Sequence, residues 1–200
     1  MSTSDPERAY HHGELRGALV AAALADLEAG GEAGLSLRAV ARACGVSAMA
    51  PYRHFADKDA LLAAVAERGF DDLGDRLAAA DASAEGASAL AAQGAAYVAF
   101  ALARPALFRL MFMGAGGLGA GGRAEGSCAD GSCAYRILSE RCAALAGPAM
   151  SAEDLTLTAW SLVHGLAALI LDRRVSVDAA GAEALARRIT TGFARLAAGG

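Results

Sequence analysis

Residues 36–58 contain two short helical patterns separated by a glycine turn, and this segment constrains the fold more than any other part of the chain. In the first pattern, apolar residues recur at the i, i+3, i+4 and i+7 spacing of one buried helix face. These residues are Leu37, Val40, Ala41 and Cys44. Ser36 stands at the N-cap position, and Gly45 can take the left-handed conformation that ends a helix. The segment therefore predicts a helix-turn-helix.

The second helix of this pair carries Tyr52, Arg53 and His54 within one turn, and Ser47 can cap it. A short helix, a glycine turn and a second helix with exposed polar and aromatic groups are typical of units that read the DNA major groove. Pro51 lies near the fourth position of the second helix, where its missing N–H removes one backbone hydrogen bond. We therefore expect an irregular first turn there.

The same segment resembles the TetR (tetracycline-repressor-like) family of transcription regulators. In that family a Tyr-x-His-Phe run is followed by Lys and then by a Leu-Leu pair. The matching residues are Tyr52, His54, Phe55, Lys58, Leu61 and Leu62. A second match, from Trp160 to Gly165, resembles the Trp-His-Gly signature of one C-terminal subgroup. The resemblance implies a C-terminal domain that holds an effector pocket and dimerises through its last two long helices.

The composition favours an all-α chain. Hydrophobic residues make up 55% of the sequence and aromatic residues only 6%, because alanine, the best helix former, supplies much of the apolar content. The net charge of −4 argues against a generally basic nucleic-acid binder. Residues 36–58 nevertheless hold four basic residues against one acidic residue, a local balance of +3. Such a patch suits a module that contacts DNA over one face.

We expect a helix-turn-helix unit of three helices over residues 1–60, a long linking helix over 61–80, and an α-helical effector-binding and dimerisation domain over 81–200. The first helix is predicted to run from Gly13 to Ala29, after a frayed polar arm at residues 1–12. Asp57 should cap the fourth helix. Its predicted buried stripe consists of Leu61, Leu62, Val65, Ala66, Gly69, Phe70, Leu73 and Leu77.

Later helices are predicted over residues 84–103, 105–113, 134–146, 151–173 and from 178 onward. Between the second and third of these, residues 114–131 hold eight glycines and predict a flexible loop. No strand precedes this loop and no Gly-Lys-Ser/Thr ends it, so it is not a phosphate-binding loop.

Four cysteines do not make a disulfide framework in a chain of this kind. Cys44 and Cys142 fall within helical patterns and are best interpreted as small core residues. Cys128 and Cys133 flank a short stretch of the glycine loop, where they could form a redox pair or half of a metal site. Two solvated thiols are the favoured interpretation.

The sequence lacks the signatures of several other protein classes. No signal peptide is visible, and the uncharged residues 86–103 and 155–171 are better explained as buried helices or a dimer seam than as membrane spans. Paired carboxylates, Gly-x-Ser-x-Gly and His-Glu-x-x-His are missing, so we expect neither an enzyme nor a cofactor or metal site. The expected location is the cytoplasm.

The predicted DNA site lies wholly within residues 36–58. The resemblance assigns Tyr52 and Lys58 to phosphates, and the hydroxyls of Ser36 and Ser47 can also reach the backbone. Base reading is expected from Ala48, Met49 and Ala50, the apolar residues at the exposed tip of the second helix. Arg38 is able to reach a guanine. The full set is Ser36, Arg38, Ser47, Ala48, Met49, Ala50, Tyr52, Arg53, His54 and Lys58.

The expected partners are double-stranded DNA with a palindromic operator, a weakly polar small-molecule effector and a second copy of the chain. The candidate effector residues are Tyr97, Phe100, Phe108, Met111, Phe112, Trp160 and His164, and each could equally be an ordinary core residue. The function predicted is therefore a repressor released by an effector. The alternative is a dimeric DNA-binding protein with no effector, whose C-terminal part only dimerises.

Overall fold

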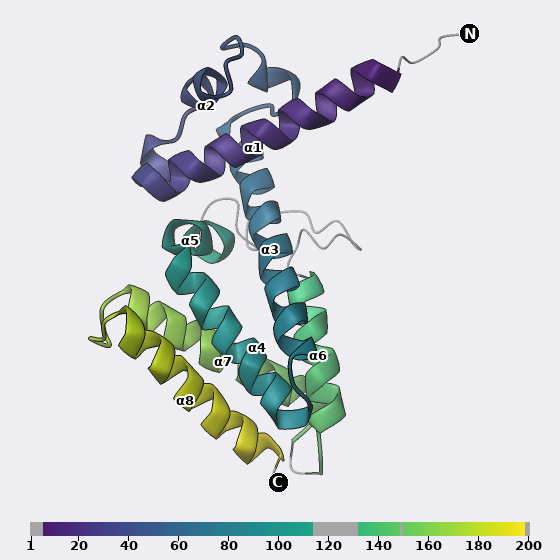
Figure 1. Cartoon of the computed structure of the whole chain (residues 1–200), viewed down its shortest axis with the longest axis vertical. Helices are drawn as coiled ribbons and strands as arrows, with labels where there is room; N and C mark the ends of the chain where they lie inside the picture. The colour runs from purple at the N-terminus through teal and green to yellow at the C-terminus, as the bar shows by residue number, and fades with distance from the viewer. Residues whose placement is uncertain (1–5, 114–131, 149, 199–200) are drawn as a thin grey trace. The chain divides into compact units, whose positions relative to one another are not determined.

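The structure is a computed structural model that describes residues 6–113, 132–148 and 150–198 (Figure 1). Within these residues the regular structure is helical, which confirms the predicted all-α fold. In chain order the elements are α1 (Pro6–Gly34), α2 (Leu37–Ala43), the 3₁₀-helix η1 (Pro51–Arg53), α3 (Lys58–Ala82), α4 (Gly86–Ala103), α5 (Pro105–Met113), α6 (Ser132–Leu145), α7 (Ala152–Leu171) and α8 (Ala179–Ala198). The predicted glycine loop at 114–131 lies outside the described residues.

The described residues divide into two compact units. The first contains residues 6–68 and 106–113, and the second contains residues 69–105 and 132–198, so α3 begins in the first unit and ends in the second. This division differs from the predicted domains, which assigned all of α5 to the C-terminal domain. One reason is local, because the Leu107 backbone N–H donates a hydrogen bond to the Glu28 carboxylate of α1 at 3.2 Å.

The first helix is longer than predicted. It begins at Pro6, so the expectation of a frayed arm is wrong for residues 6–12. Proline is favoured at the first helical position, where its missing N–H costs nothing. The helix is broken at Gly31, which has φ 70°, and a last turn reaches Gly34.

The helix ends predicted at Ser36, Gly45 and Asp57 are confirmed, whereas the cap predicted at Ser47 is wrong, because the 3₁₀-helix η1 starts only at Pro51 and its N-cap residue is Ala50. The Ser36 hydroxyl accepts the Ala39 backbone N–H at 3.2 Å at the start of α2. Gly45 has φ 68°, a conformation that an L side chain rarely adopts, and it follows directly after α2 and its C-cap residue. At the start of α3 the Asp57 carboxylate accepts the Ala60 backbone N–H at 2.8 Å. All eight residues of the predicted α3 stripe are buried.

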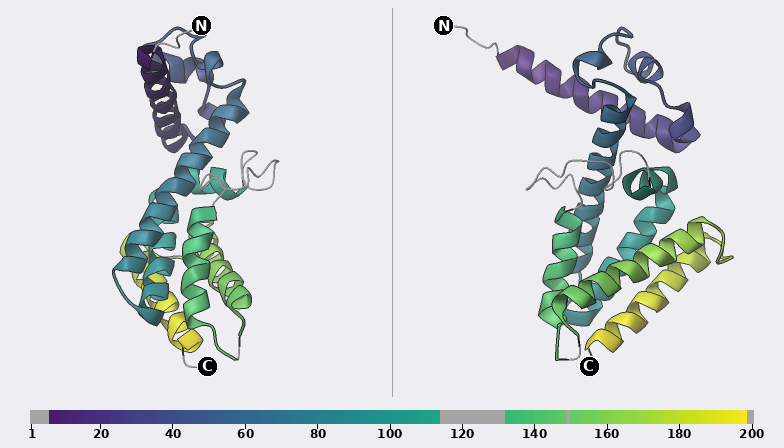
Figure 2. Two further views of the ribbon diagram at one scale, coloured as in Figure 1. Left: turned by 90° about the vertical axis from the view of Figure 1, so that its right-hand side faces the viewer. Right: turned by 180° about the vertical axis from the view of Figure 1, so that it is seen from behind.

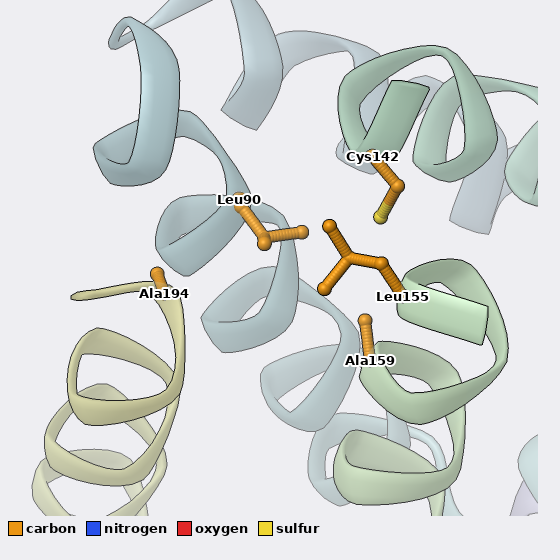
Figure 3. Packing of buried hydrophobic residues seen from close by; sticks show 5 residues of the cluster. All are labelled: Leu90, Cys142, Leu155, Ala159 and Ala194. Atoms are coloured by element: carbon orange, nitrogen blue, oxygen red, sulfur yellow. The ribbon is translucent and has the colours of Figure 1, made fainter. Parts of the chain in front are cut away.

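In the second unit α4 packs against α6, α7 and α8, and α7 and α8 lie side by side (Figure 2). A Cβ atom on Gly94 of α4 would lie 2.6 Å from the Thr190 Cγ2 atom of α8 and 3.2 Å from the Val163 Cγ1 atom of α7. Only glycine permits this approach, because a side chain at position 94 would collide with the side chains of Thr190 and Val163. One core cluster, formed by Leu90, Cys142, Leu155, Ala159 and Ala194, joins α4, α6, α7 and α8 (Figure 3).

Helices α4 and α7 are each long and apolar enough to cross a membrane by length and composition alone. For α4 the apolar content is explained by packing, since residues such as Leu90 and Val98 are buried within the second unit. Helix α7 is different, because Leu157 and Leu169 are 57% and 47% exposed. Its apolar surface is not fully covered by the described chain.

The cysteines only partly follow the predictions. Cys142 is a buried free thiol as expected, whereas Cys44 is only partly buried, with its Sγ atom 3.5 Å from the Ala18 carbonyl oxygen. Cys133 is disulfide-bonded, so the expectation of a solvated thiol is wrong at this position. Cys128 lies outside the described residues.

Candidate functional site

The segment predicted to be the recognition helix is not an α-helix. Its chain turns first, with the Ala50 N–H bonded to the Ser47 carbonyl at 2.9 Å, and then forms the 3₁₀-helix η1. The cause is Pro51, which cannot donate the backbone hydrogen bond that an α-helix needs at that position. The irregularity expected for the first turn therefore extends through the whole element, and only the Phe55 N–H reaches back four residues, to the Pro51 carbonyl.

The side chains predicted to contact DNA mostly face solvent. Met49 is 69% exposed and Tyr52 is 45% exposed. The remaining predicted DNA residues that are exposed are Ser36, Arg38, Ser47, Ala48 and Arg53. Ala50 and His54 are partly buried, and the His54 ring lies beside that of Phe55, with ring centroids 6.5 Å apart.

Two buried residues hold this element in place. Pro51 is buried, and Phe55 is only 3% exposed. The guanidinium of Arg16 on α1 lies over the Phe55 ring, 5.3 Å from its centroid, where a cation–π attraction adds to the packing. The exposed tip of the helix-turn-helix is therefore anchored by apolar contacts on its inner side.

The predicted phosphate ligand Lys58 makes a contact that the sequence did not suggest. Its Nζ atom donates to the Glu32 backbone carbonyl in the last turn of α1, at 2.6 Å. The favourable position for an ammonium near the C-terminal end of a helix accounts for this contact. Lys58 thus fixes the start of α3 to the end of α1.

The seven predicted effector residues lie in both units. In the first unit, Phe108 and Met111 of α5 are buried, and the Phe108 and Phe112 rings pack with centroids 5.0 Å apart. In the second unit, Phe100 is fully buried, and the Arg76 guanidinium lies 5.7 Å from its ring centroid. The other three, Tyr97, Trp160 and His164, form one cluster.

The centre of that cluster is a hydrogen bond of 2.8 Å between the Tyr97 hydroxyl and the His164 Nδ1 atom. Burial raises the pKa of the Tyr97 phenol and lowers the pKa of the His164 imidazole, so both groups are neutral near pH 7. Trp160 meets the His164 ring edge-on at 6.5 Å and the Tyr135 ring edge-on at 6.0 Å. The cluster combines apolar aromatic surface with a polar pair that carries no charge.

A second polar group in the same unit was missed by the sequence reasoning. Arg141 of α6 donates two hydrogen bonds to the Asp81 carboxylate of α3, at 2.7 and 2.9 Å, and Gln93 of α4 donates a third at 2.6 Å. The Arg141 hydrogen bond holds the pKa of Asp81 below its usual value. The one signal available was Gln93 itself, a lone amide in an alanine-rich apolar helix.

A groove of about 520 Å³ lies in the second unit between the end of α3, α4 and α8. It is lined mainly by alanine, serine and threonine, together with Arg187 and Arg195. None of the predicted effector residues lines it. Among the described residues, no group of three or more His, Cys, Asp or Glu side chains is placed to hold a metal ion.

The chain matches two family patterns, one that ends within α3 and one that begins within α4. Residues 19–65, which contain the helix-turn-helix, match the family described as bacterial regulatory proteins, tetR family. Residues 90–193 match the family described as tetracyclin repressor-like, C-terminal domain. The chain belongs to the TetR family. TetR-family proteins are DNA-binding transcription regulators that act as dimers and bind small-molecule effectors, and they are not enzymes.

Solved structures agree with this TetR assignment. A protein of unknown function from Rhodococcus sp. RHA1 is 39% identical, with 93% of this chain and 96% of that chain covered and a TM-score of 0.75. A TetR family transcription regulator from Marinobacter aquaeolei VT8, 19% identical, covers 92% of this chain and 97% of its own at a TM-score of 0.65. A TetR-family transcriptional regulator from Pectobacterium atrosepticum is 21% identical, with coverages of 94% and 93% and a TM-score of 0.65. The last two show the fold alone. No curated protein matches the chain.

Proposed function

We propose that this TetR-family regulator is a homodimeric repressor that leaves a palindromic operator when a weakly polar small molecule binds its second unit. The observation that carries the DNA side is the exposed tip at Met49 and Tyr52, anchored from within by Phe55. Such a regulator works in the cytoplasm, with the DNA.

At the DNA, Met49 and its two alanine neighbours are apolar and suit contact with thymine methyl groups, whereas the Arg38 guanidinium can donate two hydrogen bonds to a guanine. Tyr52, Arg53 and the two serines are assigned to phosphates and position the dimer without reading sequence. Lys58 adds positive charge while its hydrogen bond to Glu32 holds α3 against α1. His54 is partly buried and is therefore expected to contribute least to DNA binding.

The dimer is proposed to form through α7 and α8. On α7 the residues Leu157, Ser161, Gly165 and Leu169 follow each other at i, i+4 spacing on one face. The two leucines are largely exposed, and among the described residues nothing lies within 4 Å of the position that a Cβ on Gly165 would take. Among the described residues, no other helix therefore approaches Gly165 closely. A second copy would cover the stripe, with the small residues allowing its helix to approach closely.

Effector binding is assigned to the Tyr97, Trp160 and His164 cluster. A ligand acts on DNA binding only to the extent that it prefers the conformation in which the two recognition elements are wrongly spaced. A preference of about 100-fold supplies about 2.7 kcal/mol per site. The alternative is a dimer without an effector. Such a dimer would bind DNA in the same way, but a small molecule that changes the surroundings of Trp160 would not release the DNA.

The test combines selection of binding sites from random DNA with analytical ultracentrifugation. We expect a palindrome whose half-sites lie about one helical turn, ~34 Å, or a small multiple apart. Gly165→Leu should give a monomer with little operator affinity, whereas the matched change Gly17→Leu, at another open glycine, should leave the dimer intact. A monomeric wild type at micromolar concentration, or a non-palindromic site, would contradict the proposal.

A further inference from the structure

Gln93 and Tyr97 lie one turn apart on α4, so their side chains share one face of the helix. Both are buried, at 2% and 5% exposure. One turn before them, Leu90 belongs to the apolar cluster that joins α4 to α6, α7 and α8 (Figure 3). The α4 face therefore changes from fully apolar at Leu90 to polar at the next two turns.

The orientation of the Gln93 amide is fixed by its neighbour. Its Nε2 atom donates to Asp81, and a flipped amide would place the carbonyl oxygen against the carboxylate. The Oε1 atom must therefore point away from Asp81. It is buried and has no hydrogen-bond partner among the described residues. Buried acceptors in proteins nearly always accept a hydrogen bond, so a ligand donor at the Gln93 Oε1 atom would be stabilising.

The Tyr97 and His164 pair lies one turn along α4. The phenol and the His164 Nδ1 atom bind each other, and a hydrogen bond from Trp160 also acts on the phenol. The pair therefore links α4 to Trp160 of α7 without adding a charge.

We propose that the effector is an uncharged molecule with an N–H or O–H group that donates a hydrogen bond to the Gln93 Oε1 atom, and an apolar body that packs against Trp160. This inference rests on the proposed function and names the chemistry of its ligand. Two charged residues beside Gln93, Asp81 and Arg141, already bind each other through two hydrogen bonds. A charged ligand would lack a free counter-ion there and would lose its hydration.

The test uses the full-length protein and three cyclohexane probes that differ only in the polar group. These probes are cyclohexanecarboxamide, its N,N-dimethyl derivative and cyclohexanecarboxylate. Trp160 is the only tryptophan of the chain, so its fluorescence reports directly on the proposed site. Small fragments usually bind weakly, so each probe is titrated over a wide concentration range. We expect the primary amide to bind at least ~10-fold more tightly than either of the others, because only it is uncharged and carries donors.

Two variants separate the role of Gln93 from general effects on folding. Gln93→Met keeps the length of the side chain and removes the carbonyl, so the preference for the primary amide should fall to about 1-fold. Thr156→Val is the matched control, because it removes a buried hydroxyl of α7 that is already bonded to the Ala152 carbonyl. The control should keep the wild-type preference.

The inference is overturned if wild type binds the two amides equally, binds the carboxylate best, or shows no response of Trp160 to any probe. It is also overturned if Gln93→Met keeps the preference, which would assign the donor contact to another group. The wild-type comparison stands even if Gln93→Met does not fold. Gel-shift assays with the same protein preparation, on the DNA sites obtained by selection, distinguish a failure of the proposed DNA-binding function from a failure of the proposed ligand chemistry. A protein that binds its operator but shows no amide preference loses only this inference.

Discussion

Met49 and Tyr52 in the first unit are 69% and 45% exposed, whereas Gln93 and Tyr97 in the second unit are 2% and 5% exposed. The first unit presents the residues proposed to contact DNA on a short irregular element anchored by Phe55. The second unit encloses its polar groups between long helices. The difference fits the ligands proposed for each unit: DNA must be met at the surface, whereas a small molecule gains most affinity when it is enclosed. Substitutions should accordingly change DNA affinity in one unit and stability in the other.

The largest expected effect on stability is at Asp81. Asp81→Asn removes the charge that accepts both Arg141 hydrogen bonds, and hydrogen bonds to charged groups contribute about 1.5–3 kcal/mol. We expect the free energy of unfolding to fall by about 2–3 kcal/mol in urea denaturation. Asp75→Asn, at an exposed position of the same helix, is the matched control and should be nearly neutral. Equal effects of the two changes would mean that the part-buried network contributes nothing.

Gly94 provides a second test of how tightly the second unit is packed. Gly94→Ala places a methyl group 2.6 Å from Thr190 Cγ2, and overpacking of this kind costs about 1–3 kcal/mol. Thr190→Ser removes that methyl group while keeping the hydroxyl bond to Ala186, so the double variant should recover most of the loss. Gly165→Ala meets open space within the chain and serves as the control in unfolding measurements on dilute protein. A neutral Gly94→Ala would show that α4 and α8 separate easily.

In the first unit, substitutions should change DNA affinity and leave the free energy of unfolding nearly unchanged. Arg38→Ala should leave the free energy of unfolding within about 0.5 kcal/mol, because the side chain is exposed, yet weaken binding to the selected operator by about 1–3 kcal/mol. Its loss should be confined to sites that carry one particular base.

Lys58→Ala should differ from Arg38→Ala in both respects. It should weaken binding to all DNA sequences similarly. It should also reduce the slope of log affinity against log salt concentration by roughly one unit. It should also cost about 1 kcal/mol of stability, because the Glu32 carbonyl loses its partner. Salt titrations of DNA binding test the first part and urea denaturation the second. A change in sequence preference would refute the phosphate role.

The features that could be predicted from sequence are those fixed by neighbours along the chain. Ser36 and Asp57 cap helices through residues three positions away, and the α3 stripe follows from helical periodicity alone. Pro51 was recognised as a disturbance of the first turn, but the sequence did not show that the whole recognition helix would be replaced by the 3₁₀-helix η1. Short-range rules do not contain that information.

The polar network of the second unit could not be predicted for a similar reason. Gln93 and Asp81 are 12 residues apart, Arg141 and Asp81 are 60 apart, and Tyr97 and His164 are 67 apart. Which side chains of separate helices meet depends on the register of packing, and here the register is set by small residues such as Gly94. Each residue was visible in the sequence, but the pairs they form were not.

The smallest expected effect concerns His164 and acts through pH. Burial lowers its pKa in the folded protein, so between that value and about 6.5 the unfolded chain binds more protons than the folded chain. The contribution of neutral His164 is fully present above about pH 6.5 and is lost as the pH falls. His164→Asn keeps a group near Nδ1 for Tyr97 but cannot take up a proton. Wild type should therefore lose more stability than His164→Asn between about pH 7.5 and about pH 5.5 in urea denaturation. Because the rest of the chain is the same in both proteins, only the difference between the two losses counts. Equal losses would show that His164 is solvated, and that the second unit is more open than the contrast with the DNA-binding tip requires.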